Sequence, residues 1–239
     1  MTTTSTAPPA SIYILAYADC DELDVVGPMA VLQTANQYLA GNLGTRKPGQ
    51  TFVLKIVSVA GAGDVVYRGP EPDGDEHHFV TGIHGITIET TPWDGKDLPD
   101  ILIVAGGNIE PGTGIMRQRD NAAFTDVIRR QFDRDQTVVS VCTGAFGLVG
   151  ADIVRGRHVT THPGVLDMLV AAAPGLDVLN PDWDARVVDD GRIISCGGVT
   201  SGINEALYLV QKFWPKDPEL VSDVRGFVDF QYQTTLKTF

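Results

Sequence analysis

Short apolar runs rich in valine and isoleucine alternate along the chain with segments of helical periodicity, and this alternation limits the possible folds more than any other feature. The clearest runs are Ser11–Tyr17, Phe52–Val59, Pro99–Ala105 and Val138–Val141. Runs without a polar face are typical of strands in a parallel sheet that helices cover on both sides. The sequence therefore predicts an α/β fold with a mostly parallel central sheet.

Further elements are expected between and after these strands. Pro28 is typical of a first helical turn, so a helix is predicted at Pro28–Tyr38. Asp190-Gly191 is a strong turn signal and predicts a hairpin between Asp184–Asp189 and Arg192–Cys196. Further helices are predicted at 121–134, 143–154, 165–173, 199–213 and 218–227, and short strands at 86–89 and 159–161.

Composition limits the domain count and the kinds of partner. The 239 residues, 43% of them hydrophobic, suffice for one core, so we expect a disordered tail at 1–10 and a single domain at 11–239. A formal charge of −12 argues against nucleic acid and anionic membranes as partners. The sequence shows no signal peptide, no apolar run long enough to cross a membrane and only three cysteines. We therefore expect a cytoplasmic protein.

Cys142 lies where the run Val138–Val141 meets the helix expected at 143–154. A sharp strand-to-helix turn would point its side chain into the crevice beyond the carboxyl ends of the strands. The helix N-terminus would present free N–H groups and partial positive charge to the sulfur. The thiol is thus expected to ionise more readily than free cysteine and to be reactive; a buried, inert thiol is the alternative.

Asp24 precedes the helix predicted at Pro28. An acidic residue there commonly caps a helix or pairs with its dipole. The alternative is that the carboxyl group meets the sulfur of Cys142 and transfers a proton. In that arrangement the pKa of Asp24 would be raised, because like charges repel at short range.

Gly106 and Gly107 follow the strand that ends at Ala105. Without a Cβ atom their N–H groups can face the crevice, and with the N–H of Thr143 they would form a two-donor hole for developing negative charge. A phosphate-binding loop is disfavoured, because the run from Gly106 to Gly114 has neither GK[ST] nor GxGxxG.

His162, in Val159-Thr-Thr-His-Pro, either polarises the thiol or caps the turn before Pro163. A Cys–His–Glu amidotransferase triad requires an acidic residue two positions after the histidine. Gly164 stands at that position, so glutamine hydrolysis is disfavoured.

Residues 73–78 combine two histidines with three acidic residues, but a solvated turn is favoured over a metal site. Cys196 is expected to pack in the core, and Cys20 is expected to be a loop cysteine without a role, the alternative being a resolving thiol for oxidised Cys142.

Taken together, five motifs resemble the ThiJ/PfpI superfamily, and the resemblance covers Ile12 to Phe213. They are Leu23-Asp-Val-Val-Gly-Pro, Ile103-Val-Ala-Gly-Gly, Val141-Cys-Thr-Gly, Val159-Thr-Thr-His-Pro and Gly197-Gly-Val-Thr-Ser-Gly-Ile-Asn-Glu-Ala-Leu. Cys-Thr-Gly, combined with an Asp rather than a Glu before the first helix and with the Gly-Gly-Val-Thr-Ser-Gly-Ile run, is similar to the isocyanide hydratase branch. AraC-type regulators share this signature, but no helix-turn-helix region is expected, since the sequence ends at Phe239.

The resemblance implies a flavodoxin-like three-layer sandwich, a homodimer, and no metal or organic cofactor. It implies that Cys142 is the nucleophile and Asp24 the acid/base, that Thr143 and Gly107 steady charge, and that His162 occupies a position of variable role. The implied reaction adds water to an isocyanide, a small electrophilic substrate, to give an N-substituted formamide. The resemblance also leaves open a glyoxalase- or deglycase-like activity on small dicarbonyls, although such members more often carry Glu at the position of Asp24.

A third possibility is a redox or small-molecule sensor that uses an oxidisable Cys142. Two departures from the superfamily bear on the substrate. Ala105 stands where many members have proline before the two glycines, and residues 69–82 resemble an insertion that would reshape the pocket.

Overall fold

The computed structural model describes residues 8–63, 65–67, 77–174, 177–178, 185–231 and 235–238. Twelve strands lie within these ranges: β1 (Ser11–Leu15), β2 (Val53–Ser58), β3 (Val65–Tyr67), β4 (His77–Thr81), β5 (Thr87–Pro92), β6 (Ile101–Val104), β7 (Thr137–Ser140), β8 (His158–Val159), β9 (Asp177–Val178), β10 (Ala185–Asp190), β11 (Ile193–Cys196) and β12 (Thr235–Thr238). Ten of them form one sheet in the order β12-β10-β11-β7-β6-β1-β2-β5-β4-β3, and β8 pairs with β9.

The centre of the large sheet is parallel, as the sequence predicts. β1 pairs in parallel with β2 and with β6, and β7 pairs in parallel with β6 and with β11. β10 and β11 form the predicted antiparallel hairpin. The residues of β6 and β7 are all buried, which explains why their sequences lack a polar face.

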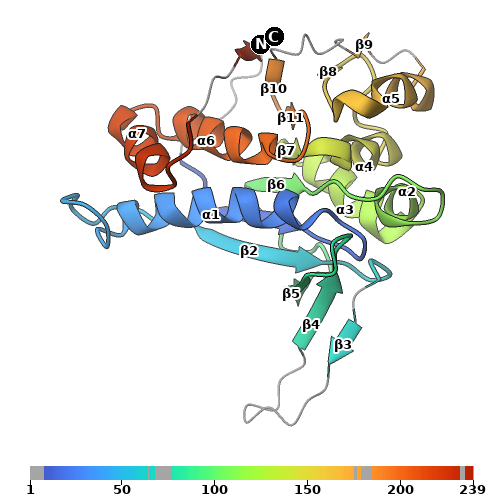
Figure 1. Ribbon diagram of the computed structural model, residues 1–239, viewed down its shortest axis with the longest axis horizontal. Coiled ribbons are helices and arrows are strands. Elements are labelled where there is room, and N and C mark those ends of the chain that lie inside the picture. Colours follow the sequence, from blue (N-terminus) through green and yellow to red (C-terminus); the bar gives the residue numbers. More distant parts are fainter. Residues whose placement is uncertain are drawn as a thin grey trace.

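Helices cover the sheet on both sides (Figure 1). One layer contains α1 (Glu22–Leu39), α6 (Ser201–Phe213) and α7 (Pro218–Phe227), which pack against one another. The other contains α2 (Gly114–Arg119), α3 (Ala122–Asp133) and α4 (Ala145–Gly150), with α5 (Leu166–Ala172) against α4. The three-layer, flavodoxin-like α/β sandwich is therefore confirmed.

The register of the central strands fixes the place of the site. Leu15 lies opposite Val104, and Val104 lies opposite Ser140, so β1, β6 and β7 end at one level. The segments that follow these strands therefore meet at one edge of the sheet. They carry Asp24, Gly106 with Gly107, and Cys142 respectively.

The predicted start of the first helix is wrong. α1 begins at Glu22, and Asp21 is its N-cap, accepting a hydrogen bond from the N–H of Leu23 at 3.0 Å. Pro28 lies inside the helix rather than in its first turn. Its missing N–H leaves the carbonyl of Asp24 without one helical hydrogen bond, an interior defect that the helix tolerates.

Several other boundaries also differ from the predictions. The helix expected at 143–154 is a 3₁₀ turn, η1 (Cys142–Gly144), followed by the short α4, and the one expected at 165–173 begins with a second 3₁₀ turn, η2 (Pro163–Val165). The strand expected at 86–89 is the longer β5, which pairs with β4, and this hairpin was not predicted. Residues 69–76 of the proposed insertion lie outside the described residues, whereas 77–81 form β4.

The two chain ends differ in how far they are described. Residues 1–7 of the expected tail lie outside the described ranges, and the N–H of Ala10 bonds to Asp100 Oδ2 at 2.7 Å. At the other end β12 pairs in parallel with β10. None of the helices in the described ranges has the length and apolar character needed to cross a membrane.

Candidate active site

Cys142 lies on a strained turn between β7 and α4. Its φ of +54° falls in the left-handed region, which few residues other than glycine adopt. The side chain is 4% exposed, and the carbonyl accepts a hydrogen bond from Thr161 Oγ1 at 2.8 Å. This turn is the predicted elbow, and it presents the sulfur at the edge of the sheet where β1 and β6 also end.

Asp24 reaches the same place from the first turn of α1. Its side chain is fully buried, and Oδ2 accepts the N–H of Gly106 at 2.9 Å. Oδ1 is buried without a hydrogen bond to a protein donor, and the Cys142 side chain is close enough to lower the pKa of the carboxyl group. The structure thus brings Asp24 and Cys142 together, and Asp21, not Asp24, caps the helix.

The protonation of the thiol differs from the prediction, whereas the pKa of Asp24 is raised as predicted, with burial as the largest cause. Burial, followed by the charge of Asp21, raises the pKa of Asp24 well above its usual value. Burial, followed by the charge of Asp24, raises the pKa of the Cys142 thiol, while the N–H of Thr143 lowers it. The prediction of a readily ionised thiol is therefore wrong, because desolvation outweighs the single 3₁₀ turn that follows the cysteine.

The carboxyl and the thiol titrate as one unit. The repulsion that Asp24 exerts on Cys142 exists only while the carboxyl is ionised, and burial disfavours that state. A protonated carboxyl can instead donate a hydrogen bond to the sulfur and so favour the thiolate. Burial thus disfavours the state in which both groups are ionised.

Gly106 and Gly107 serve the site differently from the prediction. The N–H of Gly106 bonds to Asp24, and the N–H of Gly107 donates to Thr143 Oγ1 at 2.8 Å. The Thr143 hydroxyl returns a hydrogen bond to the Gly107 carbonyl at 2.9 Å. The expected two-donor hole is thus wrong, because both glycine donors are occupied; the N–H of Thr143 remains directed at the sulfur.

Gly106 is nevertheless essential to the arrangement. A Cβ atom there would lie 2.5 Å from Asp24 Oδ2 and 2.7 Å from the backbone nitrogen of Thr143. Only glycine lets the loop after β6 approach both the acid and the turn of the nucleophile.

His162 caps a turn. Its Nδ1 accepts the N–H of Gly164 at 3.0 Å, and the ring lies against Gly198. Within the described ranges no hydrogen bond or ion pair joins His162 to Cys142. Its neighbour Thr161, which sequence reasoning missed, holds the nucleophile's carbonyl instead.

A second carboxyl–thiol pair lies behind the nucleophile and was also missed. Cys196 Sγ donates to Glu205 Oε2 at 3.5 Å, and both side chains are buried. Burial raises the pKa of Glu205 well above its usual value. The signal in the sequence was an acidic residue on the apolar face of α6, beside Ala206 and one turn before Leu209.

Two further residues singled out in the sequence, Cys20 and His77, have other partners. Cys20 is fully buried, forms a backbone bridge with Gly107, and has its pKa raised to about 12 by burial. His77 of the acidic loop pairs with Glu89.

Asp21, Glu22 and His84 cluster closely enough to hold a metal ion. The Glu22 oxygens, however, accept the N–H groups of His84 and Ile86 and contact His84 Nδ1, and Asp21 caps α1. This cluster is an ion pair beside a helix cap.

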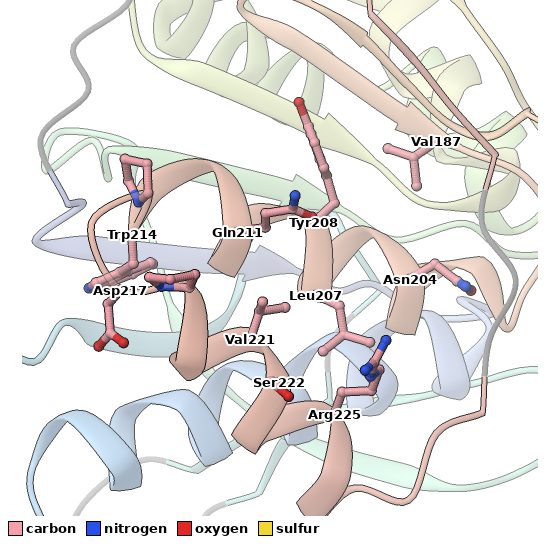
Figure 2. A pocket seen from close by; sticks show the side chains of 12 residues that line it. Val187, Asn204, Leu207, Tyr208, Gln211, Trp214, Asp217, Val221, Ser222 and Arg225 are labelled. Carbon is pink, nitrogen blue, oxygen red and sulfur yellow. The ribbon is translucent and has the colours of Figure 1, made fainter. Parts of the chain in front are cut away.

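A cavity of about 590 Å³ lies between α6, α7 and β10 (Figure 2). Apolar side chains such as Leu207, Trp214 and Val221 line it, and neither Asp24 nor Cys142 is among its described lining residues. Asn204 also lines it, yet the amide atoms of that residue are buried and without partners. The cavity is thus separate from the nucleophile.

Residues 10–212 match the DJ-1/PfpI family. The chain belongs to this family. Isonitrile hydratase from Pseudomonas putida is 34% identical over 136 residues, which cover 56% of this chain and 54% of the hydratase. Deglycase PH1704 from Pyrococcus horikoshii is 31% identical over 124 residues, which cover 50% of this chain and 68% of the deglycase. The match to the hydratase thus spans about half of that protein.

Solved structures of this family share the fold. Drosophila melanogaster DJ-1beta superposes with a TM-score of 0.69 at 16% identity, covering 93% of this chain and 98% of the other. A ThiJ/PfpI family protein from Pseudomonas syringae gives 0.68 at 20% identity, covering 99% and 81%. At these identities the likeness establishes the fold.

Proposed function

We propose that this DJ-1/PfpI protein is a cysteine-dependent enzyme that adds water to an isocyanide and forms an N-substituted formamide. The observation that carries the proposal is the pairing of Asp24 and Cys142. A carboxyl group whose pKa burial raises lies beside a thiol on a strained turn, and Gly106 fixes its position. The similarity to isonitrile hydratase supports the same chemistry.

In the first step Cys142 Sγ bonds to the terminal carbon of the isocyanide. The thiol proton passes to the Asp24 carboxyl group while the proton of that carboxyl passes to the carbon, so the acid is unchanged overall. The product is a thioimidate, Sγ–CH=N–R. A thiol with a raised pKa suits this step, because its proton is transferred as the bond forms and no free thiolate accumulates.

In the second step water adds to the thioimidate carbon. Asp24 accepts a proton from water and delivers one to the nitrogen, giving Sγ–CH(OH)–NH–R. The carbon–sulfur bond then breaks, the hydroxyl proton returns to Sγ, and the formamide R–NH–CHO leaves. The N–H of Thr143, which already points at Cys142, stabilises negative charge on the departing sulfur.

Formamide release from an aryl isocyanide tests the proposal. The wild-type protein is expected to form the formamide with saturation kinetics, and Cys142→Ala only at the rate of the buffer. Asp24→Asn keeps the side-chain shape and should be slower than wild type by about 10²–10⁴-fold, the usual contribution of a positioned acid or base. Equal rates for wild type and Cys142→Ala would refute the proposal.

Deglycase- or glyoxalase-like chemistry is the second candidate, and the similarity to a deglycase favours it. The sulfur of Cys142 would then attack the aldehyde of a small dicarbonyl. Turnover of methylglyoxal that is lost in Cys142→Ala, in a protein that ignores aryl isocyanides, would favour this activity.

A redox or small-molecule sensor is the third candidate, and the site favours it least. The sulfur is 4% exposed and burial raises its pKa, whereas oxidation requires an accessible thiolate. Selective conversion of Cys142 to the sulfinic acid by mild peroxide, without turnover of any electrophile, would favour the sensor.

We also propose a cytoplasmic homodimer that binds neither nucleic acid nor membranes. Leu23, Val26, Ile83 and Ile86 are large apolar side chains that remain exposed near the start of α1, where the Glu22 carboxylate holds the β4–β5 turn. Covering them would favour self-association. Light scattering after size exclusion is expected to give twice the 25.7 kDa of one chain, and 25.7 kDa would refute the dimer.

A further inference from the structure

A second buried thiol, that of Cys196, lies beside the turn that carries Cys142. Cys196, the last residue of β11, lies beside β7, because β11 and β7 pair in parallel up to Ser195 and Ser140. The backbone N–H of Cys142 is close enough to the Cys196 thiol to lower the pKa of that thiol. Cys196 thus contacts the residue whose backbone is in the left-handed region.

The Cys196 thiol is held in turn by Glu205. Sγ donates to Oε2 at 3.5 Å, and the exposed fractions are 0% for Cys196 and 1% for Glu205. The other oxygen, Oε1, is buried and has no hydrogen-bond partner. Cys196 Sγ therefore lies between the backbone of Cys142 and the Glu205 carboxyl, to which it donates.

Burying Cys196 and Glu205 as a polar pair lowers the stability of the folded state. A carboxyl group buried with one oxygen unsatisfied is less favourable than an apolar side chain of similar volume. Burial, followed by the charge of Asp24, raises the pKa of Glu205, which disfavours a further negative charge behind the nucleophile. Stability alone does not account for a polar pair at this place in the core.

We propose that Cys196 and Glu205 are positioning residues that hold the backbone of Cys142 in its strained conformation, so that the sulfur stays beside Asp24. The proposal rests on the nucleophilic role of Cys142. Neither residue contacts the reacting atoms. Cys196 acts as acceptor for the N–H of Cys142, and Glu205 fixes the rotamer of Cys196 that makes this possible.

The test measures carbamidomethylation of Cys142 by iodoacetamide, followed by peptide mass spectrometry, together with isocyanide turnover. Cys196→Ala is expected to slow alkylation of Cys142 about fivefold to tenfold, the fold-change that the loss of one hydrogen bond produces. In turnover kcat should fall while KM stays unchanged. Cys196→Ser retains an acceptor and should stay within about twofold of wild type. Cys20→Ala removes another buried thiol, for which the described residues show no hydrogen bond to Cys142 or Cys196, and is the matched control.

A double variant separates positioning from packing. Cys196→Ala with Glu205→Met replaces both polar partners by apolar groups, so its melting temperature should equal or exceed that of Cys196→Ala. Positioning predicts that alkylation stays slow in the double variant. Recovery of the wild-type alkylation rate together with stability would overturn the proposal, as would a wild-type rate in Cys196→Ala.

The outcomes also separate this inference from the proposed function. If Cys142 in the wild-type protein resists alkylation and turns over no substrate, the nucleophilic role fails, and the inference fails with it. If wild type reacts and the Cys196 variants react equally fast, only the inference fails.

Discussion

Replacing Gly106 by alanine should move the acid, Asp24, away from the nucleophile, Cys142, without substituting either residue. The new Cβ would lie 2.5 Å from Asp24 Oδ2, about 0.9 Å closer than the 3.4 Å at which ordinary contacts begin. The nitrogen of Thr143, at 2.7 Å, blocks movement in the other direction. The Asp24 carboxyl, the turn of Cys142 or both must therefore shift by nearly 1 Å.

Two magnitudes follow from this displacement. A shift of about 1 Å at a reacting group can cost about 10²-fold in rate, which corresponds to about 2.7 kcal/mol of transition-state free energy. Overpacking a buried site costs about 1–3 kcal/mol of folding stability. For a domain of this size, that loss should lower the melting temperature by roughly 2–4 °C per kcal/mol.

The assay compares formamide production, alkylation of Cys142 and thermal unfolding. Gly150→Ala is the matched control, because its Cβ would lie 2.5 Å from the carbonyl of Arg119, a similar clash at the far end of α4. Both variants should lose stability, but only Gly106→Ala should lose turnover beyond the change in folded fraction. Equal turnover per folded molecule in the two variants would refute the role of Gly106.

Three further predictions concern individual side chains. The raised pKa of Asp24 means that the folded state binds the proton of this carboxyl more tightly than the unfolded state does. Asp24→Asn should therefore raise the melting temperature at neutral pH, and this gain should vanish below about pH 4. His162→Ala should change kcat less than about threefold, since the ring only caps a turn; a larger loss would restore a role at the thiol. The pKa of His84 is raised and that of Glu22 lowered by their pairing, so His84→Ala should lower the melting temperature most between about pH 4.5 and 6.5; a constant difference across pH would contradict the pairing.

The fold was predictable because burial on both faces leaves a direct mark on sequence. β6 and β7 have no polar face, and the Asp190-Gly191 turn joins β10 and β11 as expected. The start of α1 was not predictable from Pro28, because a proline is tolerated inside a helix when packing stabilises the remaining turns. The β4–β5 hairpin was missed because its alternation is short and half exposed.

The site was predictable in its location but not in the protonation of its thiol. The edge where β1, β6 and β7 end follows from their parallel order, so Asp24 and Cys142 could be placed together. The degree of burial of a single thiol is a tertiary property, and desolvation reversed the expected shift in its pKa. Glu205 was missed for the same reason, because Cys196, its hydrogen-bond partner among the described residues, comes from another element.

The claim that the Asp24 carboxyl acts on the Cys142 thiol is tested most directly by the alkylation rate of Cys142 as a function of pH. The wild-type profile should differ from that of Asp24→Asn, because an amide is a weaker hydrogen-bond donor to a thiolate than a carboxylic acid is. The midpoint for Asp24→Asn is expected at higher pH than the wild-type midpoint. Superimposable profiles would mean that the carboxyl group does not act on the thiol, and the proposed chemistry would then lack its acid.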